Sequence, residues 1–381
     1  MDLPKGLAGV VIADTAISST KNDMLTYAGY PITELIANNV PYEAVVFLLW
    51  HQRLPTNAEL KNFRAALFAE MELAPDFLDT LKKISKIQRH PMSLLRTSVS
   101  FLGSTESKAE SNATAIQAKM LMIVAMIVRL RAGKKPLKAR RKLDFAGNFV
   151  YLLTGKVPSA AENDLFNKVL LLHADHEFNA STFTARVAAS TNADEYSCLT
   201  AAICALKGPL HGGANEQVYL LLDGIRSSGQ TVAEYLDSRL ANHEKIMGFG
   251  HRIYKHGDPR AFYLHDYAKI MAQHYDQMAL FNLAEAVAAY MWQTKQLKPN
   301  VDFYAAIIYH CLGVPHDIFT PIFAVSRTAG WLAHIREQKA ASYLIRPSSH
   351  YTGVYDKKVP SELQLSDLTP RSFKQEGGAA L

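Results

Sequence analysis

The hydrophobic positions along this chain repeat mainly at intervals of three and four residues, which is the period of an α-helix. This spacing runs through Ser159–Leu172 and again through Gln277–Gln296. Strand-like alternation of apolar and polar residues is almost confined to the first 15 residues and to the tail after Tyr343. The pattern therefore predicts a chain that is built from helices rather than from sheets.

Three of the expected helices begin with the same signature, a hydroxyl residue with a glutamate three positions later. These capping boxes are Thr56–Glu59, Ser159–Glu162 and Thr231–Glu234. The hydroxyl accepts a hydrogen bond from a backbone N–H that the helix leaves unpaired, and the glutamate side chain reaches back to do the same. Pro41 opens another helix, because proline fits the first helical turn. We therefore predict an all-α fold of many helices, each roughly 10–20 residues long.

The composition is that of a globular protein with a sizeable core. Of the 381 residues, 49% are hydrophobic and 20% are charged. This balance excludes a disordered, collagen-like or disulfide-scaffold protein. The three cysteines are an odd number, which indicates free thiols in a reducing compartment. The N-terminus does not resemble a secretory signal, and the longest apolar stretch, around Met120–Val128, is too short to cross a bilayer. We expect a cytoplasmic protein without a membrane partner.

The charge distribution suggests anionic ligands of small size. The net charge is +6, which is a mild basic excess. The basic run Lys134–Lys142 raises the possibility of nucleic-acid binding. It has no interleaved aromatic residues and belongs to no known nucleic-acid module, so a solvated loop or helix end is the better interpretation. We expect no nucleic-acid partner.

Candidate chemistry is concentrated at positions 207–257, where glycine and histidine recur in two irregular segments. His211 precedes a pair of glycines and His251 follows two, and glycine lets a ligand approach the backbone closely. A single loop histidine is often a surface residue, but the repeated arrangement favours a functional pair. Asp302 lies in the first turn of a helix for which Asn300 is the expected N-cap. An acid at that position also simply complements the helix dipole.

Two further groups of residues leave their roles open. His173, His176 and Glu177 suggest a metal site, but the spacing of the known zinc motifs is absent, so we prefer a core or substrate-contacting histidine and expect no metal. Three arginines each stand beside a turn or a small-residue segment: Arg260, Arg327 and Arg346. If they converge, their guanidinium groups would hold a di- or tricarboxylate; otherwise each is an ordinary surface ion pair.

Several long segments, in the same order along the chain, resemble the citrate synthase family. They are His173–Phe183, Gly208–Glu216, Gly248–Lys255, Asp258–Ala261, Asn300–Tyr304 and Phe319–Trp331. The likeness runs from about Gly6 to Gly353 and is to the compact bacterial and archaeal type, which has no additional N-terminal domain. One departure is Ala28, which stands where many members carry arginine.

The resemblance implies a homodimer in which each subunit closes over its substrates. The large domain would comprise residues 1–212 and 316–381, and the small domain residues 213–315. Arg346 matches an arginine that reaches into the active site of the partner subunit, so each site would need the dimer. Lys255 matches, more weakly, a contact for the phosphates of coenzyme A.

The resemblance also implies a role for each motif residue. Asp302 matches the base that removes a proton next to the acetyl thioester. His211 matches the group that hydrogen-bonds the resulting enolate, and His251 the group that polarises the ketone of oxaloacetate. The ligands of the oxaloacetate carboxylates and the aromatic residue beside them would be His176, Arg260, Phe323, Arg327 and, across the dimer, Arg346.

The implied activity is that of citrate synthase, an acyltransferase at the entry to the citric acid cycle. It condenses acetyl-CoA with oxaloacetate and hydrolyses citryl-CoA to citrate and CoA. Coenzyme A enters as part of a substrate, and no cofactor is expected. Two alternatives stay open: a 2-methylcitrate synthase that uses propionyl-CoA, since one extra methylene is worth only about 1–3 kcal/mol, and a catalytically silent acyl-CoA-binding protein.

Overall fold

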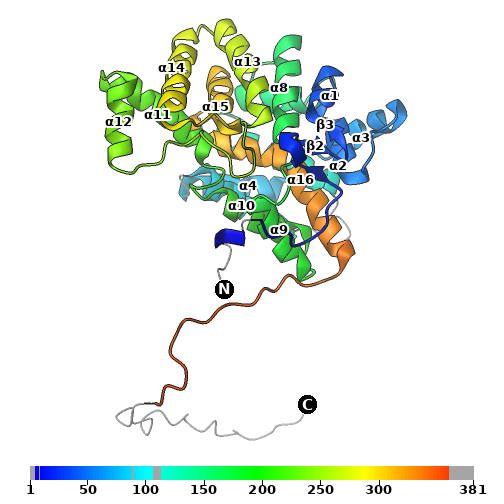
Figure 1. The fold of residues 1–381 in the computed structure, drawn as a ribbon. Coiled ribbons are helices and arrows are strands. Elements are labelled where there is room, and N and C mark those ends of the chain that lie inside the picture. Colours follow the sequence, from blue (N-terminus) through cyan, green and yellow to red (C-terminus); the bar gives the residue numbers. More distant parts are fainter. Residues whose placement is uncertain (1–4, 8, 88–89, 106–112, 360–381) are drawn as a thin grey trace, which may run out of the picture. The chain divides into compact units, whose positions relative to one another are not determined.

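The computed structural model describes residues 5–7, 9–87, 90–105 and 113–359 (Figure 1). The chain divides into two compact units, Met1–Leu344 and Ile345–Leu381. The described part of the first unit holds 16 α-helices, three short strands and three 3₁₀-helices. The described part of the second unit, residues 345–359, contains neither helix nor strand.

The predicted all-α fold is confirmed. The α-helices are α1 (Ile32–Ala37), α2 (Tyr42–His51), α3 (Asn57–Ala69), α4 (Pro75–Ile87), α5 (Pro91–Thr105), α6 (Ala113–Arg131), α7 (Phe145–Thr154), α8 (Ala160–His173), α9 (Ala180–Ser190), α10 (Glu195–Leu206), α11 (Ala214–Ser228), α12 (Val232–Ala241), α13 (Pro259–His274), α14 (Met278–Lys295), α15 (Val301–Cys311) and α16 (Phe319–Ala341). The 3₁₀-helices are η1 (Lys5–Leu7), η2 (Lys21–Asp23) and η3 (His316–Ile318).

The local signals that predicted helix ends are present in the structure. All three capping boxes form at the starts of α3, α8 and α12. In α3, the Glu59 N–H donates to Thr56 Oγ1 over 3.3 Å, and the Thr56 N–H donates to the Glu59 carboxylate over 2.8 Å. Asn300 is the N-cap of α15, as predicted, and its side chain accepts a hydrogen bond from the Asp302 N–H. These ends depend only on residues within one helical turn.

The few strands lie elsewhere than predicted. Strands β1 (Ser18–Ser19), β2 (Thr26–Tyr27) and β3 (Tyr30–Pro31) form one antiparallel sheet in the order β1-β2-β3. The described residues among the first 15, and residues 344–359, contain no strand. Ala28 and Gly29 turn the chain between β2 and β3 with φ angles of 44° and 86°, the positive values of a tight hairpin turn. Two-residue strands are too short to show an alternating pattern.

Helix α16 is the centre of the core. It packs against α2, α5, α6, α8, α9 and α10, and Figure 1 shows it crossing the middle of the first unit. Its residues from Phe319 to Ile335 are all buried, including Trp331. A helix that is buried all round is typical of the interior of a large domain, and the few polar residues of this stretch, such as Arg327, are buried with it.

Helices α11–α15 pack mainly on one another. The closest pairs are α13 with α15, α13 with α14 and α11 with α15, while α11 also contacts α16 and α13 also contacts α8. In Figure 1 these helices stand together, in green to yellow, beside the central helix. They fall within residues 213–315, and the assignment of that range as a small closing domain stays a prediction.

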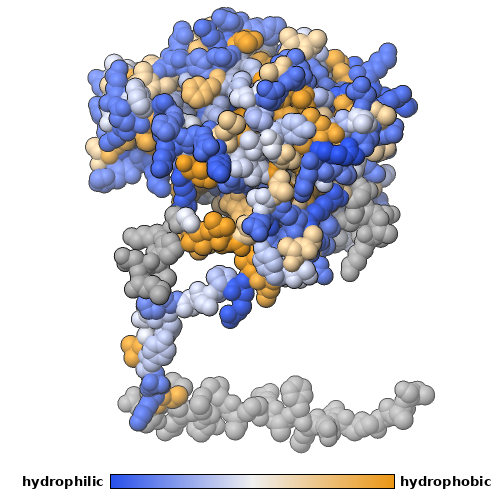
Figure 2. Space-filling model, turned by 45° about the vertical axis from the view of Figure 1, so that its right-hand side comes forward, coloured by the Kyte–Doolittle hydropathy of each residue, from blue (hydrophilic) through white to orange (hydrophobic). Residues whose placement is uncertain are grey.

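One helix in the described part of the chain, α6, is long and apolar enough to cross a membrane by length and composition. Of its most apolar window, 72% is buried against other helices, as in the core helix of a folded domain. The face of the first unit in Figure 2 is mostly hydrophilic, with apolar residues lying among the hydrophilic ones. The basic run 134–142 lies in the loop between α6 and α7, as expected.

Candidate active site

A buried ion pair joins the starts of two helices. Asp258 is the N-cap of α13, and its carboxylate accepts two hydrogen bonds from the Arg260 guanidinium, over 2.9 and 2.8 Å. The same carboxylate accepts a hydrogen bond from the Val301 N–H, the first residue of α15, over 3.1 Å. Burial lowers the pKa of Arg260, but the charge and hydrogen bonds of Asp258, together with smaller contributions from two tyrosines, outweigh burial and raise the pKa overall. Arg260 therefore stays charged inside the protein.

Asp302 follows directly in the first turn of α15. Asn300, its helix cap, also donates from its side chain to the Gly250 carbonyl over 3.1 Å, which ties α15 to the glycine-rich loop. One carboxylate oxygen of Asp302, Oδ1, is buried and has no hydrogen-bond partner in the described part of the chain. Burial raises the pKa of Asp302 to about 7, although the positive charge of Arg260 opposes the increase. A carboxylate with such a pKa is suited to act as a base near neutral pH.

The hydrogen bonds of His251 fix which ring nitrogen carries the proton. Its Nδ1 accepts from the N–H groups of Ile253 and Tyr254, over 3.1 and 3.2 Å. The neutral ring therefore carries its proton on Nε2. Burial, followed by the charge of Arg260, lowers the pKa of His251 to about 4. His251 is thus a neutral hydrogen-bond donor at physiological pH.

His211 has the opposite arrangement. Its Nε2 accepts from the Ser181 N–H over 3.2 Å and lies 2.8 Å from the Ser181 hydroxyl oxygen. That hydroxyl oxygen accepts a hydrogen bond from Trp331 Nε1. The proton of the neutral ring is therefore on Nδ1. Burial, followed by the charge of Arg327, lowers the pKa of His211 to about 4. Gly212 is required beside it, because a Cβ there would lie 2.5 Å from the Leu206 side chain.

Arg327 lies inside α16 and is almost completely buried. Its Nε donates to the His173 carbonyl over 2.7 Å, and its guanidinium stands 4.6 Å from the centre of the Phe323 ring. Its Nη2 is buried without a hydrogen-bond partner among the described residues. Burial lowers the pKa of Arg327 to about 10, so the charge persists at neutral pH. An unpaired, buried guanidinium nitrogen is a ready partner for an anion.

His176 packs against the glycine-rich loop that carries His251. Its Nε2 lies 2.9 Å from the Tyr254 hydroxyl, and its ring packs against that of His251 with 5.0 Å between centres. Burial, together with the charges of Arg260 and Arg327, lowers the pKa of His176 well below its usual value. The charges of Arg260 and Arg327 thus both reach the His176 ring, which itself packs against His251.

The metal-site alternative for His173, His176 and Glu177 gains no support from the geometry. His173 Nδ1 donates to the Val169 carbonyl over 2.7 Å, and Glu177 accepts from the Thr20 N–H. The three side chains have separate partners, and in the described ranges no three metal-ligating groups lie close enough to hold an ion.

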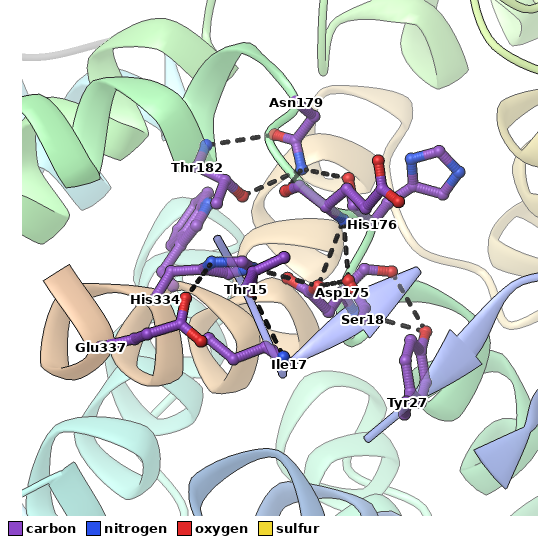
Figure 3. A network of polar contacts seen from close by, with 12 residues as sticks. Thr15, Ile17, Ser18, Tyr27, Asp175, His176, Asn179, Thr182, His334 and Glu337 are labelled. Atoms are coloured by element: carbon purple, nitrogen blue, oxygen red, sulfur yellow. Dashed lines mark hydrogen bonds and ion pairs between the residues drawn. The ribbon is translucent and has the colours of Figure 1, made fainter. Parts of the chain in front are cut away.

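Sequence reasoning missed the polar network behind His176 (Figure 3). Asp175 is completely buried, and its Oδ2 lies 3.2 Å from His334 Nε2 and accepts from the Glu177 N–H over 3.2 Å. The Tyr27 hydroxyl donates to the Leu171 carbonyl over 3.0 Å at the same place. No local signal in the sequence indicates this network, because Tyr27, Asp175 and His334 are each more than 140 positions apart along the chain. Asp258 could have been found, because aspartate before proline is a typical helix start.

Two further candidates have exposed side chains. Lys255 has an exposed side chain on the loop after His251, and its backbone N–H donates to Asp23 Oδ1 over 3.3 Å. Arg346 belongs to the second unit, where it is exposed. Their assigned roles stay predictions.

The cluster combines a base, two neutral imidazole donors and two guanidinium groups; the arginines are buried and the other three residues are half-buried. Its members come from α13, α15, α16 and the two glycine-rich segments. This set suits removal of a proton next to a carbonyl group, followed by attack on an electrophile that carries carboxylates.

Comparison with known proteins decides the family. The family model described as "Citrate synthase, C-terminal domain" matches residues 6–348. The chain belongs to the citrate synthase family. It is 45% identical over 371 residues to citrate synthase 2 of Bacillus subtilis, with 95% of this chain and 99% of that protein covered. It is 42% identical to a 2-methylcitrate synthase of Mycobacterium tuberculosis, with 94% and 93% covered.

Solved structures of family members have the same fold. A citrate synthase of Thermoplasma acidophilum, in a ternary complex with carboxymethyl coenzyme A and oxaloacetate, matches with a TM-score of 0.87 at 28% identity, covering 94% of this chain and 99% of that chain. The citrate synthase of Thermotoga maritima matches with a TM-score of 0.85 at 34% identity, covering 95% and 99%. Membership of this family makes the chain an acyltransferase-type condensing enzyme.

Proposed function

We propose that this chain is a citrate synthase that condenses acetyl-CoA with oxaloacetate and hydrolyses citryl-CoA to citrate and CoA. The observation that carries the proposal is the buried, unpartnered Oδ1 of Asp302, in a carboxylate whose raised pKa fits a base at neutral pH. The charges of Arg260 and Arg327 act on this same carboxylate. The complex of the Thermoplasma relative with a CoA compound and oxaloacetate supports the choice of substrates.

In the first step, Asp302 accepts a proton from the methyl carbon of the acetyl thioester. The C–H electron pair becomes the C=C bond of an enolate, and the negative charge moves to the thioester oxygen. His211 donates a hydrogen bond to that oxygen from Nδ1, the nitrogen that Ser181 leaves free. A neutral imidazole is sufficient for this purpose, because a prepositioned donor stabilises the charge as it develops.

In the second step, the enolate carbon attacks the ketone carbon of oxaloacetate. The C=O electron pair moves to the ketone oxygen, which His251 polarises through its Nε2–H. That oxygen takes up one proton to become the hydroxyl of citryl-CoA, which balances the proton that Asp302 removed. Arg260 and the free Nη2 of Arg327 hold the carboxylates, with His176 beside them and the Phe323 ring against Arg327. Water then adds to the thioester carbon of citryl-CoA and the C–S bond breaks. One proton of the water passes to the CoA sulfur, which leaves as the thiol, and the other is released to solvent as the new carboxylate forms.

The choice between acetyl-CoA and propionyl-CoA is tested by thiol release in the presence of oxaloacetate. We expect a higher kcat/KM for acetyl-CoA, and Asp302→Asn should abolish release with either substrate. A preference for propionyl-CoA would instead indicate a 2-methylcitrate synthase, an activity that the Mycobacterium relative carries in its name. No release with either substrate from the folded protein would support a silent acyl-CoA-binding protein.

The proposal extends to assembly and location. We propose a cytoplasmic homodimer in which Arg346 completes the oxaloacetate site of the partner subunit. In mixed dimers of Arg346→Ala and Asp302→Asn chains, one site would then combine both defects and the other would be intact. If the site is shared, the mixed dimer should recover about half the activity of a wild-type dimer, because one of its two sites is intact. No recovery would contradict sharing.

A further inference from the structure

We infer that the N-terminal arm, residues 15–23, is a strap that positions His176 and His251. This inference rests on the proposed function. No residue of the arm belongs to the substrate-contacting set, yet the arm makes hydrogen bonds to residues beside both histidines.

The first anchor of the arm is the turn that carries His176. The Ser18 hydroxyl donates to the Asp175 carboxylate and accepts from the Glu177 N–H over 3.0 Å. The Thr20 N–H donates to the Glu177 carboxylate over 2.7 Å. Both neighbours of His176 are therefore held by the arm. Glu177 has a φ of 46°, which a side-chain-bearing residue adopts only when its surroundings hold it there.

A chain of polar groups, most of them buried, links this anchor to another point on the arm; Figure 3 shows its members Asp175, His334 and Glu337. Asp175 meets His334 Nε2 at 3.2 Å, and Arg186 Nη1 donates to His334 Nδ1 over 3.1 Å. The same Arg186 nitrogen donates to Glu337 over 2.6 Å, and Glu337 accepts from the Ala16 N–H over 2.8 Å. The arm thus closes a continuous hydrogen-bonded ring on the back of the His176 turn. Such a network fixes its members in one arrangement.

The second anchor is the loop that carries His251. Asp23 Oδ1 accepts from the Lys255 N–H over 3.3 Å, and Asp23 Oδ2 lies 2.6 Å from His256 Nδ1. The hydrogen bond from His256 lowers the pKa of Asp23, so the carboxylate is charged at neutral pH. The residues it holds follow directly on Tyr254, whose N–H fixes the His251 ring.

The two anchors are five positions apart along the arm, whereas the two histidines they serve are 75 positions apart in the sequence and pack ring to ring at 5.0 Å. The arm is therefore a short connection between the two segments that form this side of the site. If either anchor is lost, the corresponding histidine is no longer held by the arm. A misplacement of roughly 1 Å at a catalytic group can reduce a rate by about 100-fold.

The test compares Asp23→Asn with Asp14→Asn, an exposed aspartate just before the arm. We expect Asp23→Asn to lower kcat/KM for oxaloacetate by about 5- to 100-fold, with little change in melting temperature, because the Asp23–His256 pair lies near the surface. Asp14→Asn should match the wild type, and Asp23→Glu, which keeps the carboxylate, should recover part of the loss.

Hydrogen exchange provides a readout that does not depend on activity. Asp23→Asn should speed amide exchange across residues 251–256, and Ser18→Ala across residues 174–179. If the arm acts as one strap, the losses in kcat/KM of the two variants should not add in the double variant. An Asp23→Asn protein that matches Asp14→Asn in kinetics overturns the inference, even if exchange is faster. A wild-type protein that releases no thiol would instead refute the proposed function. The hydrogen-exchange comparison would then still show whether the arm holds residues 251–256 and 174–179 in place.

Discussion

Replacement of Asp302 by asparagine should abolish activity and at the same time stabilise the folded protein in a pH-dependent way. In the wild type, burial raises the pKa of this carboxyl from 3.8 to about 7. The folded chain therefore retains a proton that the unfolded chain releases at a lower pH. Asparagine has nearly the same shape and is neutral in both states, so it removes only this linkage.

The size and sign of the effect follow from the two pKa values. Between pH 4 and 7 the unfolded state has lost the proton and the folded state has not, so wild-type stability falls as the pH rises. The fall is about 1.4 kcal/mol per pH unit and reaches roughly 4 kcal/mol above pH 7, where it levels off. With an unfolding entropy of about 2.1 cal/mol/K per residue, the melting temperature of the compact unit Met1–Leu344 changes by roughly 1.4 °C for each kcal/mol of unfolding free energy.

The assay is the melting temperature of the wild type and of Asp302→Asn, measured without substrate from pH 5 to pH 8. The advantage of the variant should widen by roughly 2.5 kcal/mol over this range, or about 3–4 °C. Asp14→Asn, at an exposed position, is the control and should show no such trend. A constant difference between Asp302→Asn and the wild type across this range would refute the argument that Asp302 is held protonated by burial.

Three further substitutions test the packing and charge of the site. Arg327→Lys should raise KM for oxaloacetate by about 30-fold or more, because lysine cannot supply the free Nη2 donor; an unchanged KM would remove Arg327 from the site. Asp258→Asn leaves the Arg260 charge buried without its partner, so unfolding free energy should fall by about 3–5 kcal/mol in denaturant titrations, and a fall below 1 kcal/mol would contradict this. Gly330→Ala places a Cβ against the Asp175 carboxylate and 2.6 Å from the Ala174 carbonyl; the melting temperature should drop by several degrees, and wild-type stability would show that the backbone can yield there.

Much of the fold was predictable because its signals are local. The capping boxes of α3, α8 and α12 and the N-cap of α15 each involve residues within one turn, so the sequence carries all the information that the helix start needs. The strands were missed because they carry no such local signal. Strand β1 pairs with β2 through two residues each, and nothing in so short a segment distinguishes it from a loop.

The motif residues of the candidate site were also identified from the sequence, but their chemical state was not. That His211 carries its proton on Nδ1 and His251 on Nε2 depends on Ser181, Ile253 and Tyr254. The raised pKa of Asp302 depends on burial of its carboxyl in the folded chain and on the nearby charges of Arg260, Asp258 and Arg327. The roles of Lys255 and Arg346 stay predictions, since the structure shows both side chains as exposed.

The sequence by itself thus determined where helices begin, which residue types are available for catalysis, and the family to which they point. Only the tertiary structure decided that Ser18 meets Asp175 and that Asp258 neutralises Arg260 beneath the site. The physical reason is that hydrogen-bond caps act over a few bonds along the chain. Burial, proton affinity and ion pairing depend instead on neighbours that are distant in sequence and become close only after the chain has folded.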